Sequence, residues 1–341
     1  MITLWLHFLI SSLFVTGAGL YIGRVSGELG ERLKLGKAWA GAVLLSLATT
    51  LPELITTVTV VWRGETGLAF GGVLGSMVFN LFILVVVDIF DTDPIYHRLS
   101  TNHLLTGLLG CVLLSAVVFG LSLGQVGTPQ FKDIQAISFI GISSIAIIFF
   151  YIAGQIILFQ LAKSENAEPR IKIATAFDRF STKQIFGIYF GLAGIIIIAA
   201  YQLGIAAENL GRAFNFSATF AGATLIGIVT SLPEFTNGIA CARQKEYDLA
   251  MGNILGANAF VIVVLAIADL LYLKGSIFSF LSPTDATSSI IMASLAIMMQ
   301  GVALGALAGR SRHRIWRLGA ASVLLLFLYW VSLVIAYRFS L

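Results

Sequence analysis

Two glutamates each follow a proline directly in the middle of an apolar segment, in Leu51-Pro52-Glu53 and in Leu232-Pro233-Glu234. Proline removes a backbone donor and clashes with the preceding turn of a helix, so it frees carbonyl groups. Hydroxyl-bearing residues stand immediately before each motif: Thr49, Thr50, Thr230 and Ser231. Carboxylate, hydroxyl and carbonyl oxygens are ligands that hard cations such as Na⁺ and Ca²⁺ prefer. The pattern therefore predicts an oxygen-lined cation site.

The surroundings of Glu53 and Glu234 strengthen this prediction. A charge at the centre of a bilayer costs about 3 kcal/mol on the insertion scale. No Lys or Arg occurs at comparable depth in any span predicted below, so each carboxylate must be protonated, paired or bound to a cation. Two facing glutamates without a counter-charge favour a cation. The structural alternative is a pair of protonated glutamates that are hydrogen-bonded inside a helix bundle.

A second apolar segment follows each glutamate and is rich in small residues: Gly71, Gly72, Gly75 and Ser76, and then Gly252, Gly256 and Ala257. Small residues let helices approach closely. Ser76 and Asn80 are spaced i, i+4 and share one helix face, so both can point oxygens at the same site. Asn253 and Asn258 are five residues apart and share a face less well. Asp88 and Asp269, near the ends of these segments, are expected to be solvated carboxylates at the membrane interface.

The composition indicates that membrane helices must position these residues. The chain has 341 residues, of which 58% are hydrophobic and 11% charged, and its mean hydropathy is +0.94. A soluble domain needs more charge than this on its surface. Runs such as 195–200 are apolar all round, whereas the strands of a membrane barrel alternate in polarity. The composition therefore predicts an all-α membrane protein in contact with lipid.

The chain contains ten apolar runs that are separated by charged residues, Gly or Pro, and each run is a predicted span. A span needs about 20 apolar residues. The expected spans are 3–23, 39–62, 67–90, 101–122, 133–160, 184–204, 218–242, 247–272, 287–308 and 315–337. The first of them lacks the basic start of a signal peptide, so we expect a true span. Cys111 and Cys241 both lie in apolar runs, with no disulfide framework or zinc signature.

The basic residues predict the orientation of these spans. The odd-numbered loops, which follow the first, third, fifth, seventh and ninth spans, hold 16 of the 21 Lys and Arg residues. In membrane proteins the cytoplasmic loops carry the excess of Lys and Arg. Both termini are therefore expected outside, and the central loop in the cytoplasm. The calculated pI of about 9.1 is explained by these loops, so nucleic acid is not an expected partner.

An internal repeat relates the two halves of the chain. A shift of 181 positions aligns residues 46–88 with residues 227–269 without a gap, and 13 of these 43 positions are identical. Five spans separate the copies, so the second copy crosses the membrane in the opposite direction. Inverted repeats of this kind place substrate and coupling ions near the midplane, where the halves meet.

The repeat also predicts the domain organisation. A first five-helix half (1–161) contains the first repeat, about 39–90. A cytoplasmic linker (162–183) separates it from a second five-helix half (184–341), which contains the second repeat, about 218–272.

The two motifs resemble the G-T-S-L-P-E motif of the α-repeats in the cation/Ca²⁺ exchanger superfamily, and 75–80 and 256–260 resemble its G-S-N-x-x-N segment. The branch that the chain resembles is that of the prokaryotic Na⁺/Ca²⁺ exchangers. The resemblance implies that Glu53 and Glu234 bind Ca²⁺ as central ligands, without a cofactor. It also implies a multi-pass protein of a prokaryotic plasma membrane. The remaining ligands that it implies, for Na⁺ or Ca²⁺, are Thr49, Thr50, Thr230, Ser231, Ser76, Asn80 and the backbone near Ser46 and Gly227.

Three positions depart from the family pattern. Residue 257 is alanine where the pattern has serine, residue 261 is valine where a polar or acidic residue is usual, and residue 77 is methionine instead of asparagine. Alanine and valine side chains carry no hydrogen-bonding atoms. The second half has therefore lost ligand oxygens that the first half keeps.

The main functional hypothesis is a secondary active antiporter that exchanges Ca²⁺ for Na⁺ by alternating access. The first alternative keeps the fold but couples Ca²⁺ or another cation to H⁺, because a proton needs only a carboxylate. An intramembrane enzyme with the two glutamates as acid and base is a weaker alternative, since no Arg or Lys accompanies either motif to hold phosphate. A passive channel is the third. The sequence leaves ion stoichiometry and oligomeric state open.

Overall fold

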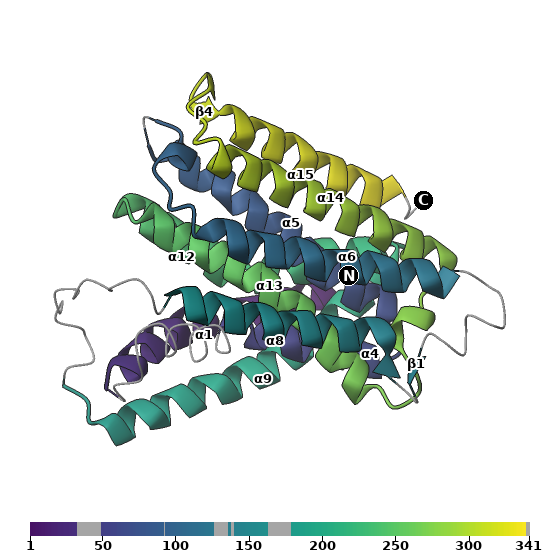
Figure 1. Cartoon of the computed structure of the whole chain (residues 1–341). Coiled ribbons are helices and arrows are strands. Elements are labelled where there is room, and N and C mark those ends of the chain that lie inside the picture. Colours follow the sequence, from purple (N-terminus) through teal and green to yellow (C-terminus); the bar gives the residue numbers. More distant parts are fainter. Residues whose placement is uncertain (33–48, 92, 126–135, 138–139, 163–178, 339–341) are drawn as a thin grey trace.

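The computed structural model describes residues 1–32, 49–91, 93–125, 136–137, 140–162 and 179–338, and these are almost entirely helical (Figure 1). The first half contains α1 (Ile2–Arg32), α4 (Leu51–Trp62), α5 (Thr66–Ile89), η2 (Ile95–His97), α6 (His103–Gln125), β1 (Ala136–Ile137), β2 (Ile140–Gly141) and α8 (Ile142–Ala162). The second half contains α9 (Thr182–Ala213), α10 (Ala218–Ala221), η3 (Gly222–Gly227), α11 (Ile228–Thr230), α12 (Leu232–Arg243), α13 (Tyr247–Leu271), η4 (Ile277–Ser279), α14 (Pro283–Ala308), β3 (Arg314–Ile315), β4 (Leu318–Gly319) and α15 (Ala320–Arg338).

The observed helices agree with most of the predicted spans. Within the described ranges, eight helices are long and apolar enough to cross a membrane, and the bent pair 218–230 and 232–243 makes a ninth. The predicted span 39–62 is seen only from Thr49 onward, as α4, because residues 33–48 lie outside the described residues. The chain is therefore a multi-pass helical membrane protein, and the count of ten spans stays a prediction.

Two span boundaries were wrong. The predicted span 133–160 includes a short antiparallel hairpin of β1 with β2, and the predicted span 315–337 begins inside a second one, of β3 with β4. The helices α8 and α15 start only after these hairpins, at Ile142 and Ala320. The hairpin residues Ile137, Ile140, Ile315 and Leu318 are apolar, so hydropathy could not separate them from the helix that follows.

The expectation that Asp88 and Asp269 are solvated was also wrong, since they are 1% and 0% exposed. Asp88 Oδ1 accepts a hydrogen bond from the Ile95 amide (2.9 Å), and its Oδ2 accepts one from the Gly319 amide (2.7 Å). Asp269 accepts bonds from the amides of Ile277 (2.7 Å) and Gly141 (2.8 Å) in the same way. Each carboxylate thus ties the end of its helix to a hairpin of the chain, and amide donors replace the lost water.

We expect Asp88→Ala to lower the thermal stability of the purified protein. The substitution leaves two buried amides without an acceptor, and each costs about 1–3 kcal/mol. The melting temperature in detergent, followed by tryptophan fluorescence, measures the effect. Asp93→Asn is the matched control, because Asp93 is 56% exposed in a surface ion pair with Arg98. An unchanged melting temperature in Asp88→Ala would show that these hydrogen bonds contribute nothing.

The backbone repeats closely between the two copies. Thr50 and Ser231, which precede α4 and α12, have φ/ψ values of −93°/2° and −90°/3°. Gly64 and Lys245, 181 positions apart, both adopt positive φ, at 84° and 60°. The amides of these two residues and of the glutamate that follows each make the same turn bonds to preceding carbonyls. The turns 63–65 and 244–246 are therefore conformational equivalents, although only one of them has glycine at the left-handed position.

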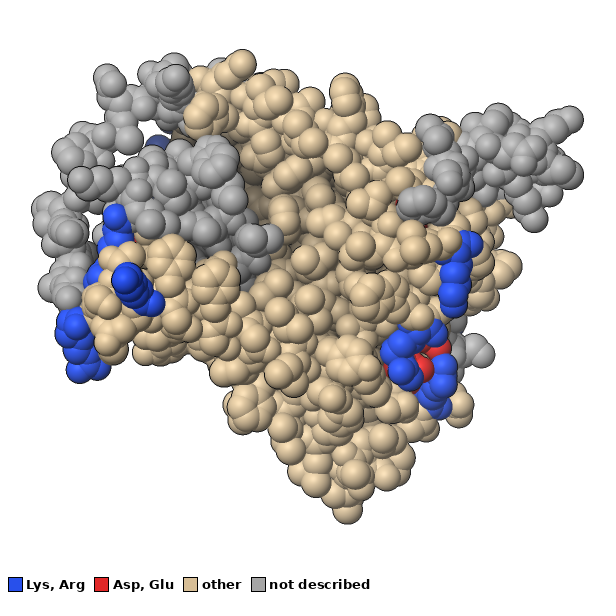
Figure 2. Space-filling model, turned by 90° about the horizontal axis from the view of Figure 1, so that it is seen from below, with Lys and Arg blue, Asp and Glu red and all other residues tan. Residues whose placement is uncertain are grey.

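The helices pack as two groups. A large apolar core joins α5, α6, α8, α13, α14 and α15, whereas α1 and α9 pack chiefly on each other, with separate small clusters between them. In Figure 1 these two helices extend from near the centre of the view toward its lower left. Seen from below, the molecule shows a wide band without charged side chains between two charged edges (Figure 2). Large exposed apolar side chains such as Phe149, Ile198 and Phe327 are consistent with lipid contact.

Candidate cation-binding site

Both glutamates lie in the first turn of a helix that begins at a break. In the second half, the axis turns by 47° between the segments 218–230 and 232–243, and Pro233 stands at the start of α12. The π-helix η3 precedes this break, a form that often occurs at functional sites. Glu53 has the same place at the start of α4. A helix N-terminus stabilises negative charge, so the fold favours carboxylates at these two positions.

The two carboxyl groups are buried together. Glu53 and Glu234 are 3% and 2% exposed, and they are near enough for each charge to repel the other. The Thr230 hydroxyl, which donates to the Ile226 carbonyl at 3.0 Å, is also among the groups that act on Glu53. Within the described ranges, the Oε2 atom of each glutamate has no hydrogen-bond partner. Two buried carboxylate oxygens that point at no protein donor can accept a proton or a cation.

Ser76 and Thr230 bring hydroxyl oxygens from the two halves together. Ser76 Oγ lies 3.3 Å from Thr230 Oγ1 and donates to the Gly227 carbonyl at 3.2 Å. The contact depends on a close crossing of α5 with η3: a Cβ at Gly75 would lie only 2.4 Å from the Ala223 Cα atom. The predicted ligands Ser76, Thr230 and Gly227 are therefore neighbours in space.

Asn80 pairs with Asn258 across the interface between the halves. Asn80 Nδ2 donates to Asn258 Oδ1 at 3.0 Å, and Asn258 Nδ2 donates to the Met77 carbonyl at 3.4 Å. Asn80 Oδ1 is buried and has no partner in the described part of the chain. The five-residue spacing from Asn253 had made Asn258 a weak candidate, although it is fully buried here. Asn258 is repeat-related to Met77, and Asn80 to Val261, so the symmetry-related contact joins two apolar residues.

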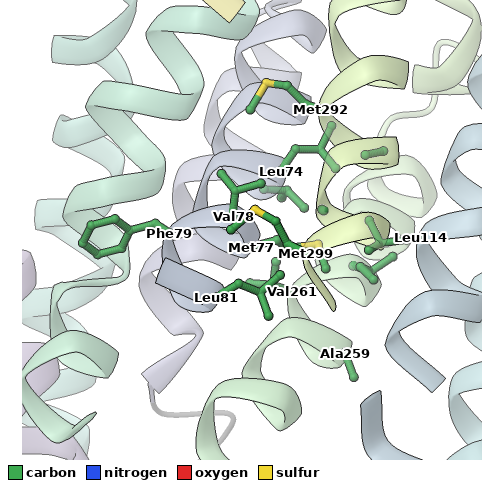
Figure 3. Close-up of a cluster of buried hydrophobic side chains, with 14 of the residues drawn as sticks. Leu74, Met77, Val78, Phe79, Leu81, Leu114, Ala259, Val261, Met292 and Met299 are labelled. Atoms are coloured by element: carbon green, nitrogen blue, oxygen red, sulfur yellow. The ribbon is translucent and has the colours of Figure 1, made fainter. Parts of the chain in front are cut away.

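The positions that depart from the family pattern belong to the apolar core. Met77 and Val261 are in one cluster of buried hydrophobic residues with Leu74, Leu81 and Met299 (Figure 3). Ala257 is buried as well. These three positions therefore supply apolar surface where the family pattern has ligand oxygens.

A pocket of about 240 Å³ leads to Glu234. Its walls come from α1, α12 and α13, with Thr49 as the predicted ligand that also faces it. The lining residues that the sequence interpretation missed are Arg24, Thr236 and Asn237. Asn237 follows Glu234 by three residues and so shares its helix face, which is the signal that could have identified it.

The other predicted ligands have different positions. Thr50 is buried, and the Oγ atom of Ser231 is buried with no partner among the described residues. Ser46 lies outside the described residues. Among the described residues, no three His, Cys, Asp or Glu side chains come together. A cation between the glutamates would therefore take its further ligands from hydroxyl, amide and carbonyl oxygens.

Comparison with known proteins gives matches over nearly the whole chain. The profile of the family described as sodium/calcium exchanger protein matches residues 3–158 and again residues 183–338. The inner membrane protein YrbG of Escherichia coli (strain K12) is 27% identical over 230 residues, about 66% of each chain. The putative antiporter CaxA of Alkalimonas amylolytica is 24% identical over 290 residues, 83% of this chain and 84% of its own.

Solved structures show the same fold. The H⁺/Ca²⁺ exchanger CAX superposes with a TM-score of 0.71 at 14% identity, over 99% of this chain and 84% of its own. The sodium-calcium exchanger NCX_Mj, soaked with 2.5 mM Na⁺ and 0.1 mM Ca²⁺, gives a TM-score of 0.60 at 18% identity, over 98% of each chain. At these identities, the likeness is one of fold.

Proposed function

Because the chain belongs to the sodium/calcium exchanger protein family, we propose that it exchanges Ca²⁺ for Na⁺, with Ca²⁺ held between Glu53 and Glu234 at mid-membrane. One observation carries the proposal: two buried carboxylates each keep an oxygen without a partner among the residues that the structure describes. In the described part of the chain, neither glutamate forms an ion pair with Lys or Arg. Two carboxylates neutralise one divalent ion, and Na⁺ competes for the same oxygens.

Transport then proceeds by alternating access between inverted halves, 1–161 and 184–341, joined by the cytoplasmic linker 162–183. The basic residues of the odd-numbered loops orient the ten spans, with both termini outside.

The pocket at Glu234 runs along Thr236, Asn237 and Ala240 toward the end of α12 at Arg243. On the predicted orientation that end lies on the cytoplasmic side, which supports a conformation open to the cytoplasm. Relatives that are named for an activity are exchangers and antiporters, which supports transport over an intramembrane enzyme or a channel.

Coupling to H⁺ is the second candidate, and the apolar surroundings of Met77 and Val261 favour it. A Na⁺ site needs several oxygens at once, whereas a proton needs only a carboxylate. In the second half, Ala257 and Val261 supply none. Protonation of Glu53 and Glu234 would then release Ca²⁺ without any further ligand.

Calcium uptake into proteoliposomes under separate gradients distinguishes these functions. We expect vesicles loaded with Na⁺ to take up ⁴⁵Ca²⁺ well above the rate of choline-loaded vesicles when no pH gradient exists. Uptake that responds to an acidic interior, and not to internal Na⁺, would establish H⁺ coupling instead. Saturable flux that is independent of both gradients would contradict antiport altogether.

A further inference from the structure

Two charged residues near the C-terminal end of α9 form a compact ion-pair network with two charged residues of the turn that joins α4 to α5. Arg63 Nε pairs with Glu208 Oε2, and Arg63 Nη2 donates to Glu208 Oε1 at 3.3 Å. Arg212 Nη2 contacts Glu65 Oε1 at 2.5 Å and Glu208 Oε1 at 3.0 Å. Glu208 is only 4% exposed. Two positive and two negative charges thus join α9 to the turn between α4 and α5, on the side predicted to face outward.

The helices beneath this network are closed against each other. Near the network, α9 packs extensively along α4. A Cβ at Gly204 would meet the side chains of Val60 and Thr59 at 3.2 and 3.4 Å. The inverted repeat relates α4 to α12 and α9 to α1. On that opposite side, α1 packs along α12 much less, and the pocket at Glu234 separates them, lined by Arg24 and Ala240. One side is thus closed and the other open.

The open side carries the same elements of sequence. Both α1 and α9 end with Glu and Arg spaced i, i+4: Glu28 and Arg32 in one helix, Glu208 and Arg212 in the other. In α1 the two residues pair with each other at 2.6 Å. The turn 244–246 has the same backbone conformation as the turn 63–65. It has Gln244 in place of Arg63, and Glu246 in place of Glu65.

We propose that Arg63, Glu65, Glu208 and Arg212 form an outer latch, which holds the cytoplasm-open conformation. When the latch opens, α1 closes on α12 and Arg32 pairs with Glu246 as the inner latch. This proposal rests on the proposed function, because it describes how the same central site is exposed to alternate sides. The inner latch has one arginine where the outer latch has two, so the cytoplasm-open conformation is the more stable at rest.

The Arg63 guanidinium of the outer latch keeps its charge over the physiological range. The hydrogen bond to Glu208 is the main cause that raises the pKa of the Arg63 guanidinium above its usual value. Substitution, rather than alkaline pH, is therefore needed to open the latch. The exposed guanidinium groups also make it sensitive to ionic strength.

Cysteine accessibility tests the latch without measuring transport. In a background without Cys111 and Cys241, Ala240→Cys reports on the open pocket, since Ala240 is exposed there. The repeat-related Thr59→Cys reports on the closed side, since Thr59 is buried. Labelling of each by an impermeant maleimide is measured in vesicles of known orientation.

We expect Glu65→Gln with Arg63→Gln to raise the labelling rate of Thr59→Cys relative to that of Ala240→Cys by about 5-fold or more, the range of ordinary conformational coupling. Glu65→Arg with Arg212→Glu should raise the ratio less than this, because the exchanged charges still pair with each other although the contact of Arg212 with Glu208 is lost. Gln244→Arg should also raise the ratio, because it gives the inner latch the arginine that it lacks and leaves the outer latch intact. Arg98→Gln is the control, since Arg98 is as exposed as Arg63 and also forms surface ion pairs.

The proposal would be overturned if the labelling ratio were unchanged both in the double variant Glu65→Gln with Arg63→Gln and in the single variant Gln244→Arg. It would also be overturned if the control Arg98→Gln changed the ratio equally. These outcomes are independent of the proposed function. If the protein exchanges Ca²⁺ normally but the variants show no change in labelling, only the latch proposal is wrong. If labelling changes as expected but the protein moves no Ca²⁺, only the proposed function is wrong.

Discussion

Proteoliposomes that contain Glu53→Gln or Glu234→Gln are expected to lose Ca²⁺ exchange almost completely. Each substitution removes one of two buried charges that would neutralise a divalent ion, and it keeps the shape of the side chain. Truncating one partner of a buried charge pair costs about 2–5 kcal/mol, which corresponds to roughly 30-fold to several thousand-fold in affinity. The measurement is ⁴⁵Ca²⁺ uptake against external Ca²⁺ concentration, with the amount of folded protein matched by size-exclusion chromatography.

Asp93→Asn makes the same chemical change at an exposed carboxylate and should exchange Ca²⁺ as the unsubstituted protein does. The assignment of the site would be wrong if either glutamine variant kept normal exchange. A defect confined to Glu234→Gln would also contradict it, because the proposed site needs both carboxylates at once.

The second large effect is expected at Gly75, where helix α5 crosses η3. A Cβ at this position would lie 2.4 Å from the Ala223 Cα atom and 2.6 Å from its carbonyl oxygen. Backbone cannot rotate away as a side chain can, so the helices must separate. Overpacking costs about 1–3 kcal/mol and occasionally more, and a loss near the upper end lowers the melting temperature by roughly 5–10 °C. We therefore expect Gly75→Ala to unfold in detergent at a lower temperature than the unsubstituted protein.

Helix separation at Gly75 would also move Ser76 away from Thr230, so the exchange rate should fall even in protein that remains folded. Gly301→Ala is the control, because Gly301 is exposed on α14 and a Cβ added there would meet open space. Equal melting temperatures for Gly75→Ala and Gly301→Ala would show that the crossing is looser than the geometry indicates.

Much of the fold could be predicted from the sequence, because apolar runs indicate the spans and the repeated polar residues indicate the two halves. The helices α5, α6 and α13 lie within a few residues of the predicted spans. The repeat at Leu51-Pro52-Glu53 predicted a second broken helix at Leu232, where the break is observed. Burial of Glu53 and Glu234 also follows from their place in apolar segments.

The rest depended on contacts that a linear pattern does not contain. Asp88 and Asp269 looked interfacial because they end apolar runs, yet amides from hairpins far along the chain surround them. Asn258 could not be recognised from helix spacing alone, since its partner Asn80 lies in the other half. Arg24 is separated from Glu234 by most of the chain, and only the packing of α1 on α12 brings it to the same pocket.

The hydrogen bond between Asn80 and Asn258 has a consequence for the ancestry of the two halves. A twofold assembly of two first halves would place Asn80 opposite Met77, and one of two second halves would place Val261 opposite Asn258. Neither homodimer could form this bond, whereas the fused chain forms it once. This contact therefore belongs to the pairing of two different halves, and a homodimer of either half would lack it.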